Sequence, residues 1–101
     1  MRLKKYTIRS RGSCSVIIEA SNSDLLKAAM PDGSLLLIDG DGRGITVLCA
    51  EGAVCLTQPS DPEDSILYSG EIFIIDRKGL VAVTALTDAL INISTKILRS
   101  S

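Results

Sequence analysis

The chain has 101 residues, of which 46% are hydrophobic and 23% are charged, and its formal net charge at pH 7 is −1. A chain of this length forms one domain with one core, and so small a core cannot bury all of that apolar material. The charge balance does not favour nucleic acid as a partner, and no apolar run reaches the roughly 18 residues of a membrane span. We therefore expect a single domain over residues 1–101 with a surplus of apolar surface.

The N-terminal segment is strongly basic and has no apolar stretch typical of a secretory signal peptide. It contains no acid among its first eleven residues and five cations, Arg2, Lys4, Lys5, Arg9 and Arg11. Such a segment could contact phosphates, but nucleic-acid binders interleave aromatic side chains for stacking, and Tyr6 is the one available. We interpret the segment as an exposed edge strand that its Lys and Arg side chains protect from aggregation.

Short runs rich in β-branched residues recur along the chain and are separated by Gly, Asp, Ser and Pro. This pattern is typical of strands and turns. The expected strands are Leu3–Ile8, Ser15–Glu19, Ser34–Ile38, Ile45–Cys49, Ala53–Thr57, Ser65–Tyr68, Ile72–Ile75, Leu80–Ala85 and Ala89–Ile93. From Ser34 onward the runs recur about every ten residues, the spacing of antiparallel sandwiches and barrels. The sequence therefore predicts an all-β fold.

One segment favours a helix instead. Ser23 or Asn22 can cap a short helix over Ser23–Met30, Asp24 lies in its first turn, and Pro31 follows its end. Because eight residues are too few for a stable isolated helix, this segment must pack on the sheet.

The glycine-rich stretch after the third of these strands could suggest a phosphate or calcium loop. Gly40-Asp41-Gly42-Arg43-Gly44 is followed by a strand rather than a helix, which excludes a dinucleotide fingerprint, and a Gly-Lys-Ser/Thr sequence is absent. In a calcium loop beginning at Asp39, the fifth ligand position would be Arg43 and the twelfth Ala50. A hairpin turn is the favoured interpretation.

Carboxylates gather in and after the one long polar loop, Gln58–Asp64. Asp61, Glu63 and Asp64 lie in it, and Glu71 follows the next expected strand. These four residues are our candidate functional loop, because carboxylates serve in general acid–base catalysis or in binding hard cations. The interpretation that we favour for the loop is an Asx-type turn with solvated acids, whose backbone Pro62 fixes, and Glu71 is likewise more typical of a turn than of a catalyst.

The chain contains no histidine. This absence removes the histidine-based nucleophilic systems and the usual ligand sets for zinc, iron and copper. The cysteines Cys14, Cys49 and Cys55 are odd in number and none are spaced as CxxC, which fits reduced thiols in a bacterial-type cytoplasm. We therefore expect no metal, no cofactor and a cytoplasmic location.

Residues Asp32–Ser94 resemble a family of small uncharacterised bacterial proteins that form a cupin-like domain. The resemblance is carried by Val54-Cys55-Leu56-Thr57, by the loop Ser60-Asp61-Pro62-Glu63-Asp64 and by Leu67-Tyr68-Ser69-Gly70-Glu71, and it continues through Lys78-Gly79 and the Val-rich strand that ends at Ala85. It implies a small cupin-like antiparallel β-barrel or sandwich of the jelly-roll type.

The chain departs from this family at several positions. Val54 or Cys55 stands where the family has Trp, Ser60 where it has Gly, and Ser69 where it has Pro. Cupin enzymes bind metal through histidines, one of which would fall near Leu80 or Val81, both apolar here. The resemblance thus implies the fold without its metal chemistry, and a fold alone assigns no function.

Three functional hypotheses remain. The first is a non-catalytic binding or assembly module that self-associates as a homo-oligomer, with a symmetric dimer favoured. The second is a sensor that holds a small apolar ligand inside the barrel. The third, which we rank last, is a metal-independent enzyme that uses the candidate loop residues or a lysine.

Overall fold

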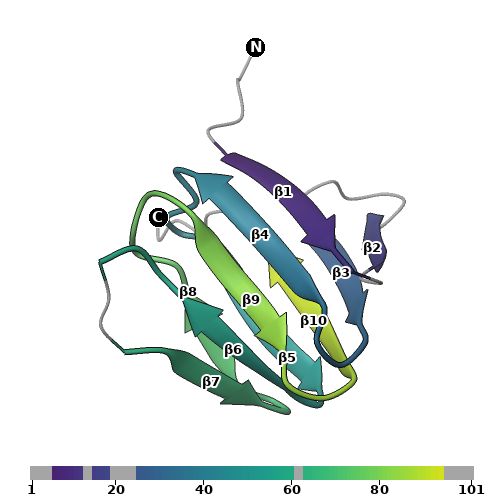
Figure 1. The fold of residues 1–101 in the computed structure, drawn as a ribbon. Coiled ribbons are helices and arrows are strands. Elements are labelled where there is room, and N and C mark those ends of the chain that lie inside the picture. The colour runs from purple at the N-terminus through teal and green to yellow at the C-terminus, as the bar shows by residue number, and fades with distance from the viewer. Residues whose placement is uncertain (1–5, 13–14, 19–24, 61–62, 95–101) are drawn as a thin grey trace, which may run out of the picture.

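The fold is a sandwich of two antiparallel β-sheets (Figure 1). The computed structural model describes residues 6–12, 15–18, 25–60 and 63–94, with the backbone alone for 15–18. Its strands are β1 (Tyr6–Arg11), β2 (Ser15–Ile18), β3 (Leu25–Met30), β4 (Leu35–Gly40), β5 (Thr46–Glu51), β6 (Ala53–Thr57), β7 (Ser65–Tyr68), β8 (Ile72–Ile74), β9 (Val81–Ala85) and β10 (Ala89–Ser94). The predicted all-β class is confirmed.

Each sheet has five strands. Sheet A has the order β1-β4-β9-β6-β7, and sheet B has the order β2-β3-β10-β5-β8. The chain passes from one sheet to the other at most connections, and β2–β3 and β6–β7 are the pairs of consecutive strands that hydrogen-bond to each other. Since the described strands form two separate sheets, the domain is a sandwich and the barrel alternative is not realised as a closed barrel.

The core lies between the two sheets. Side chains along a strand point alternately to its two faces, so each strand contributes every second residue to the interior. In β9 the inward residues Val81, Val83 and Ala85 are buried, and Ala82 and Thr84 between them are half-buried on the outer face. The buried apolar set is Leu26, Ala28, Met30, Leu36, Ile38, Ile45, Val47, Cys49, Val54, Leu56, Leu67, Ile75, Val81, Val83, Ala85, Ala89, Ile91 and Ile93.

The helix predicted over Ser23–Met30 is wrong for the part of it that the structure describes. Residues Leu25–Met30 are strand β3, which pairs with β10 on one side and with β2 on the other. Leu26, Ala28 and Met30 are buried, and Lys27 and Ala29 between them are exposed, a period of two. The helix propensity of Leu, Lys, Ala and Met is weak compared with two ladders of backbone hydrogen bonds and three buried side chains.

The Gly-rich segment after β4 is also different from the prediction. It connects β4 in sheet A with β5 in sheet B, so it is a crossover between sheets and not a hairpin. The Arg43 guanidinium donates to both carboxylate oxygens of Asp41 at 2.8 Å, and Gly44 N donates to Ile75 O at 2.8 Å. Arg43, which stands at the fifth position of the calcium loop that we rejected, thus forms an ion pair with Asp41.

The turn between β5 and β6 lies tightly against the turn between β9 and β10. Ala53 N donates to Thr87 Oγ1 at 3.1 Å, and Leu86 N donates to Ala53 O at 2.9 Å. Gly52, the residue that joins β5 to β6, has φ +81°. A Cβ at this position would collide with the carbonyl oxygen of Asp88 and lie 2.8 Å from Thr87 Oγ1. The close approach of these two turns therefore requires glycine.

We expect Gly52→Ala to destabilise the domain by about 2–5 kcal/mol, since a positive φ costs an L-residue about 1–2 kcal/mol and a tight contact adds about 1–3 kcal/mol. Gly70→Ala is the matched control, because Gly70 also has a positive φ, +91°, with nothing within 4 Å of its Cβ position. Urea unfolding of both variants measures the difference. Equal destabilisation of the two variants would contradict the close approach of the turns.

Candidate interaction surface

Among the predicted loop carboxylates that the structure describes, Glu71 is separated from Glu63 and Asp64 by strand β7. Asp61 lies outside the described residues, and Glu63 and Asp64 precede β7 while Glu71 follows it at the other end. Glu71 accepts a hydrogen bond from Tyr68 N at 2.8 Å, which makes it a turn residue. Asp64 accepts one from Thr57 Oγ1 at 3.5 Å. Glu71 therefore cannot act with Glu63 or Asp64 on one reacting group.

The interior offers little chemistry. In the ranges that the structure describes, no group of three His, Cys, Asp or Glu residues could hold a metal ion. Of the two residues near the expected cupin histidine, Val81 is buried in the core and Leu80 is exposed. The Cys49 thiol is buried and donates to the carbonyl oxygens of Glu51 and Gly52 at 3.4 and 3.3 Å.

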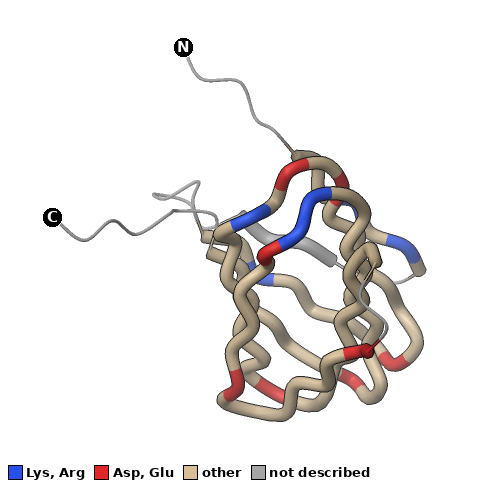
Figure 2. Tube along the Cα trace, turned by 90° about the vertical axis from the view of Figure 1, so that its left-hand side faces the viewer, with Lys and Arg blue, Asp and Glu red and all other residues tan. Residues whose placement is uncertain are grey.

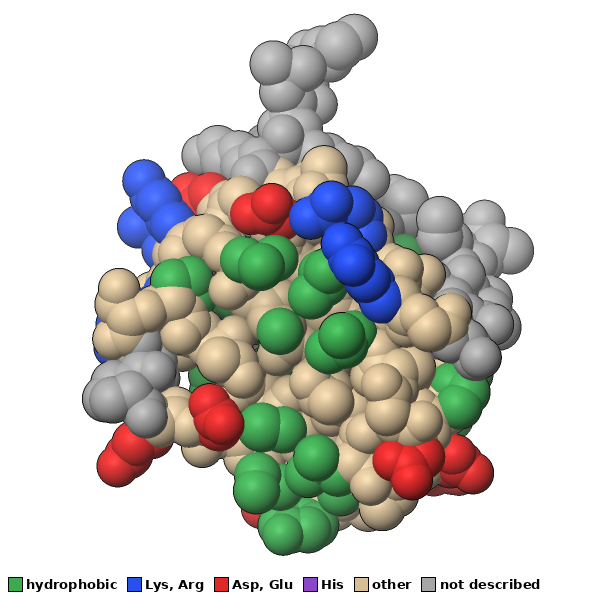
Figure 3. All heavy atoms as spheres, viewed as in Figure 1, with side chains coloured by type: hydrophobic (Ala, Val, Ile, Leu, Met, Phe, Trp, Pro, Cys, Tyr) green, Lys and Arg blue, Asp and Glu red, His purple; other side chains and the backbone are tan. Residues whose placement is uncertain are grey.

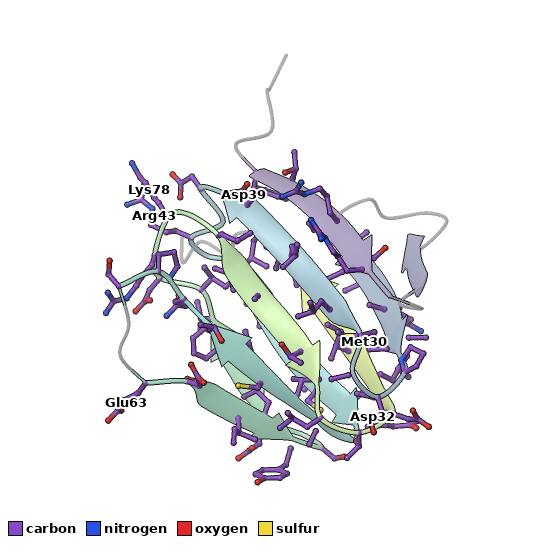
Figure 4. All side chains as sticks on the ribbon, in the orientation of Figure 1. Met30, Asp32, Asp39, Arg43, Glu63 and Lys78 are labelled. Atoms are coloured by element: carbon purple, nitrogen blue, oxygen red, sulfur yellow. The ribbon has the colours of Figure 1, made fainter. Side chains whose placement is uncertain are left out.

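The two ends of the sandwich differ in charge (Figure 2). One end carries Arg43 and Lys78 together with Asp39, as Figure 4 shows, and Arg43 is paired with Asp41. This ion pair holds the pKa of the Asp41 carboxyl well below its usual range. The described turns at the other end carry acids without Lys or Arg, namely Asp32, Glu51, Glu71 and Asp88. Each end also has one buried polar residue, Ser34 in the turn of Asp32 and Gln58 beside Asp76, and each side chain is hydrogen-bonded to the backbone.

Apolar side chains gather on the outer face of sheet A, as Figure 3 shows. Six large hydrophobic residues in the described ranges are exposed. Alternation along β7 places Ile66 and Tyr68 on this face, and Leu80 and Leu86 lie directly before and after β9, the middle strand of the sheet. Tyr68 is 60% exposed and Ile66 is 47% exposed. The half-buried Leu35, Ala82 and Cys55 continue the apolar area between them, with Leu37. We call this area the sheet A face.

Opposite charges lie at the two edges of the sheet A face. Arg9 and Arg11 are exposed on edge strand β1, which agrees with the expectation of a basic edge strand. Arg9 pairs with Asp39 of β4, the two charged groups being 3.6 Å apart. At the other edge, the bond from Thr57 holds the Asp64 carboxylate beside β7. The face therefore has a cationic edge, an apolar middle and an anionic edge.

Comparisons with known proteins add the fold alone. No family model matches the chain, and no curated protein matches it in sequence. The fold is similar to that of VPA0057, a protein of unknown function from Vibrio parahaemolyticus, with a TM-score of 0.51 and 8% sequence identity. The match covers 84% of this chain and 100% of the other. The resemblance to cupin-like domains stays a prediction.

The second exposed apolar area is smaller. Ile72 and Ile74 are 58% and 60% exposed on β8, an edge strand of sheet B. Sequence reasoning expected surplus apolar surface but did not locate either area. The alternation of Ile66 and Tyr68 with the buried Leu67 contains the signal, yet it does not say which neighbour strands share the face.

The cysteines of the described segments are not activated nucleophiles. Burial and the Glu71 charge raise the pKa of Cys49, and burial and the Asp64 charge raise the pKa of Cys55. Reactive cysteines have a lowered pKa and a positive neighbour, and neither thiol has these.

We expect iodoacetamide at about pH 8 to label Cys55 more slowly in the folded protein than in urea, because a raised pKa lowers the thiolate fraction. The rate at Cys55 should rise about tenfold per pH unit until its pKa is passed. Cys49 should be labelled only when the protein unfolds. Peptide mass spectrometry measures each site, and labelling of native Cys55 at pH 7 at the rate of the unfolded chain would contradict the assignment.

Proposed function

We propose that this protein is a non-catalytic binding or assembly module that self-associates through the sheet A face. The observation that carries the proposal is the exposed apolar area of this face, where Ile66 and Tyr68 lie on β7 and Leu80 and Leu86 adjoin the two ends of β9. Contiguous exposed apolar areas on a small domain mark interaction sites, whereas scattered single residues do not.

A second copy of the chain suits this face better than an unrelated partner of one charge sign. Its cationic edge at Arg9 and Arg11 and its anionic edge at Asp64 are complementary to each other. Homo-oligomers with two-fold symmetry use the same patch on both subunits, so a patch must be complementary to itself. A face with opposite charges at opposite edges meets that condition.

The size of the face sets the expected strength of association. Five strands about 4.8 Å apart and about six residues long at about 3.4 Å per residue give a face of roughly 20 by 20 Å. The area is below the roughly 800 Å² per partner of standard interfaces. We therefore expect dimers that form at micromolar rather than nanomolar concentration.

The interior gives less support to the sensor and enzyme hypotheses. The two buried polar residues in the described part of the chain are Ser34 and Gln58, and both already have partners. Ser34 Oγ donates to Pro31 O at 2.7 Å, and Gln58 Oε1 accepts from Asp76 N at 3.2 Å. Both bonds go to backbone groups of the connecting segments, which gives these two residues a structural role.

No helix in the described ranges is long and apolar enough to cross a membrane.

We expect the protein to show a reversible monomer–dimer equilibrium in sedimentation velocity between about 1 and 200 μM, since interfaces of this size are weak. Ile66→Lys should raise the dimer dissociation constant at least about tenfold, because it places a charge in an apolar contact. Ile66 is 47% exposed, so the substitution should leave the monomer folded.

Ile74→Lys is the matched control on sheet B, where Ile74 is 60% exposed. It should leave the dissociation constant unchanged within about twofold. A wild-type protein that is monomeric over the whole range would overturn self-association. Dissociation by Ile74→Lys and not by Ile66→Lys would place the interface on sheet B instead.

A further inference from the structure

We propose that two copies pack sheet A against sheet A about a two-fold axis parallel to the strands, so that Arg9 of each copy faces Asp64 of the other. This inference rests on the proposed function and specifies its geometry. It follows from the strand register of sheet A together with the position of its charges.

The register places Arg9 and Asp64 at the two ends of one row across the face. Arg9 is opposite Leu37 in the β1–β4 ladder, and Leu37 is opposite Ala82 in the β4–β9 ladder. Ala82 is opposite Thr57 in the β9–β6 ladder, and Thr57 Oγ1 donates to Asp64. A cation and a carboxylate thus flank a centre of Leu, Ala and the Thr methyl group.

The charges distinguish between two symmetric ways of stacking the face on itself. An axis parallel to the strands exchanges β1 with β7 and keeps each row at its own height, so Arg9 of one copy lies over Asp64 of the other. An axis in the plane of the sheet and perpendicular to the strands places β1 over β1, with Arg9 and Arg11 over like charges. Like-charge juxtaposition across an interface is unfavourable, which favours the parallel axis.

The neighbouring row is compatible with the same axis. It runs from Arg11 through Leu35, Thr84 and Cys55 to Ile66. Under the proposed axis, the aliphatic stem of Arg11 lies over Ile66 of the other copy, with its guanidinium in solvent, as long cationic side chains commonly pack. Thr84 belongs to β9, the middle strand of the sheet, and therefore lies near its own counterpart.

The existing ion pair of Arg9 does not oppose this arrangement. Arg9 and Asp39 are 3.6 Å apart, with side chains 54% and 49% exposed. Exposed ion pairs of this kind contribute little to stability, so Arg9 can turn toward a second carboxylate at small cost. For the same reason, substitution of Arg9 should leave the monomer folded.

A charge exchange tests the pairing of Arg9 with Asp64. Arg9→Asp places two carboxylates together at each end of the interface, and Asp64→Arg places two guanidiniums together. We expect each single variant to raise the dimer dissociation constant about five- to twentyfold at low salt, and the double variant to return it to within about threefold of the wild type. Sedimentation velocity measures the constants, and circular dichroism confirms folding.

Failure of the double variant to recover would overturn the two-fold arrangement, provided that Ile66→Lys still dissociates the dimer. With that outcome the sheet A face would still be the interface, but Arg9 would not face Asp64 of the other copy. A monomeric wild type overturns the proposed function itself. The two failures are therefore distinguishable.

Cross-linking tests whether β9 lies at the centre of the contact between the two copies. Sheets stacked face to face lie about 10 Å apart, beyond the Cα separation of a disulfide, so a short bis-maleimide is the suitable reagent. In a Cys14→Ser, Cys55→Ser background, Thr84→Cys should yield cross-linked dimer at least about fivefold more than Thr46→Cys, which lies on β5 of sheet B. The buried Cys49 stays in place in both proteins. Equal yields would contradict a contact centred on β9, whereas the charge exchange decides between the two axes.

Discussion

The packing of one face of sheet A against one face of sheet B is the interaction on which the rest of this structure depends. Because the side chains of a strand alternate between its faces, each strand can supply only every second residue to that contact. Val81, Val83 and Ala85 of β9 fill it together with Ile91 and Ile93 of β10. An apolar side chain at an alternate position of a strand lies on an outer face, as Ile66 and Tyr68 of β7 do. The chain is 46% hydrophobic, and part of that apolar material lies on the outer faces.

The position of this surplus gives the protein its most distinctive surface. The connections at the two ends of the sandwich carry charges, and the mostly apolar interior contains the Cys49 thiol, whose pKa burial raises. The outer face of sheet A is left as the place where apolar area and opposite charges occur together. A surface of that composition can recognise a shape and a charge pattern.

The sequence was informative wherever local chemistry decides the structure. The strand limits Ala53–Thr57 and Ser65–Tyr68 were predicted correctly, because apolar runs there are bounded by Gly and by the Pro-containing loop. Leu25–Met30 was predicted incorrectly, because its residues favour a helix in isolation and its two partner strands are not visible in a local window. The separation of Glu71 from Asp64 was likewise not visible in a local window of the sequence. Glu71 and Asp64 are close in sequence, and a strand between them separates them in space.

The order of strands in sheet B has a consequence for how the protein folds. The central strand of that sheet, β10, is the last strand in the described part of the chain and pairs with β3 on one side and with β5 on the other. The β2–β3 pair and the β5–β8 pair therefore cannot join into one sheet until β10 has been synthesised. Pairing over such a sequence separation is slow, because the entropy of closing a long loop is lost before the contacts form.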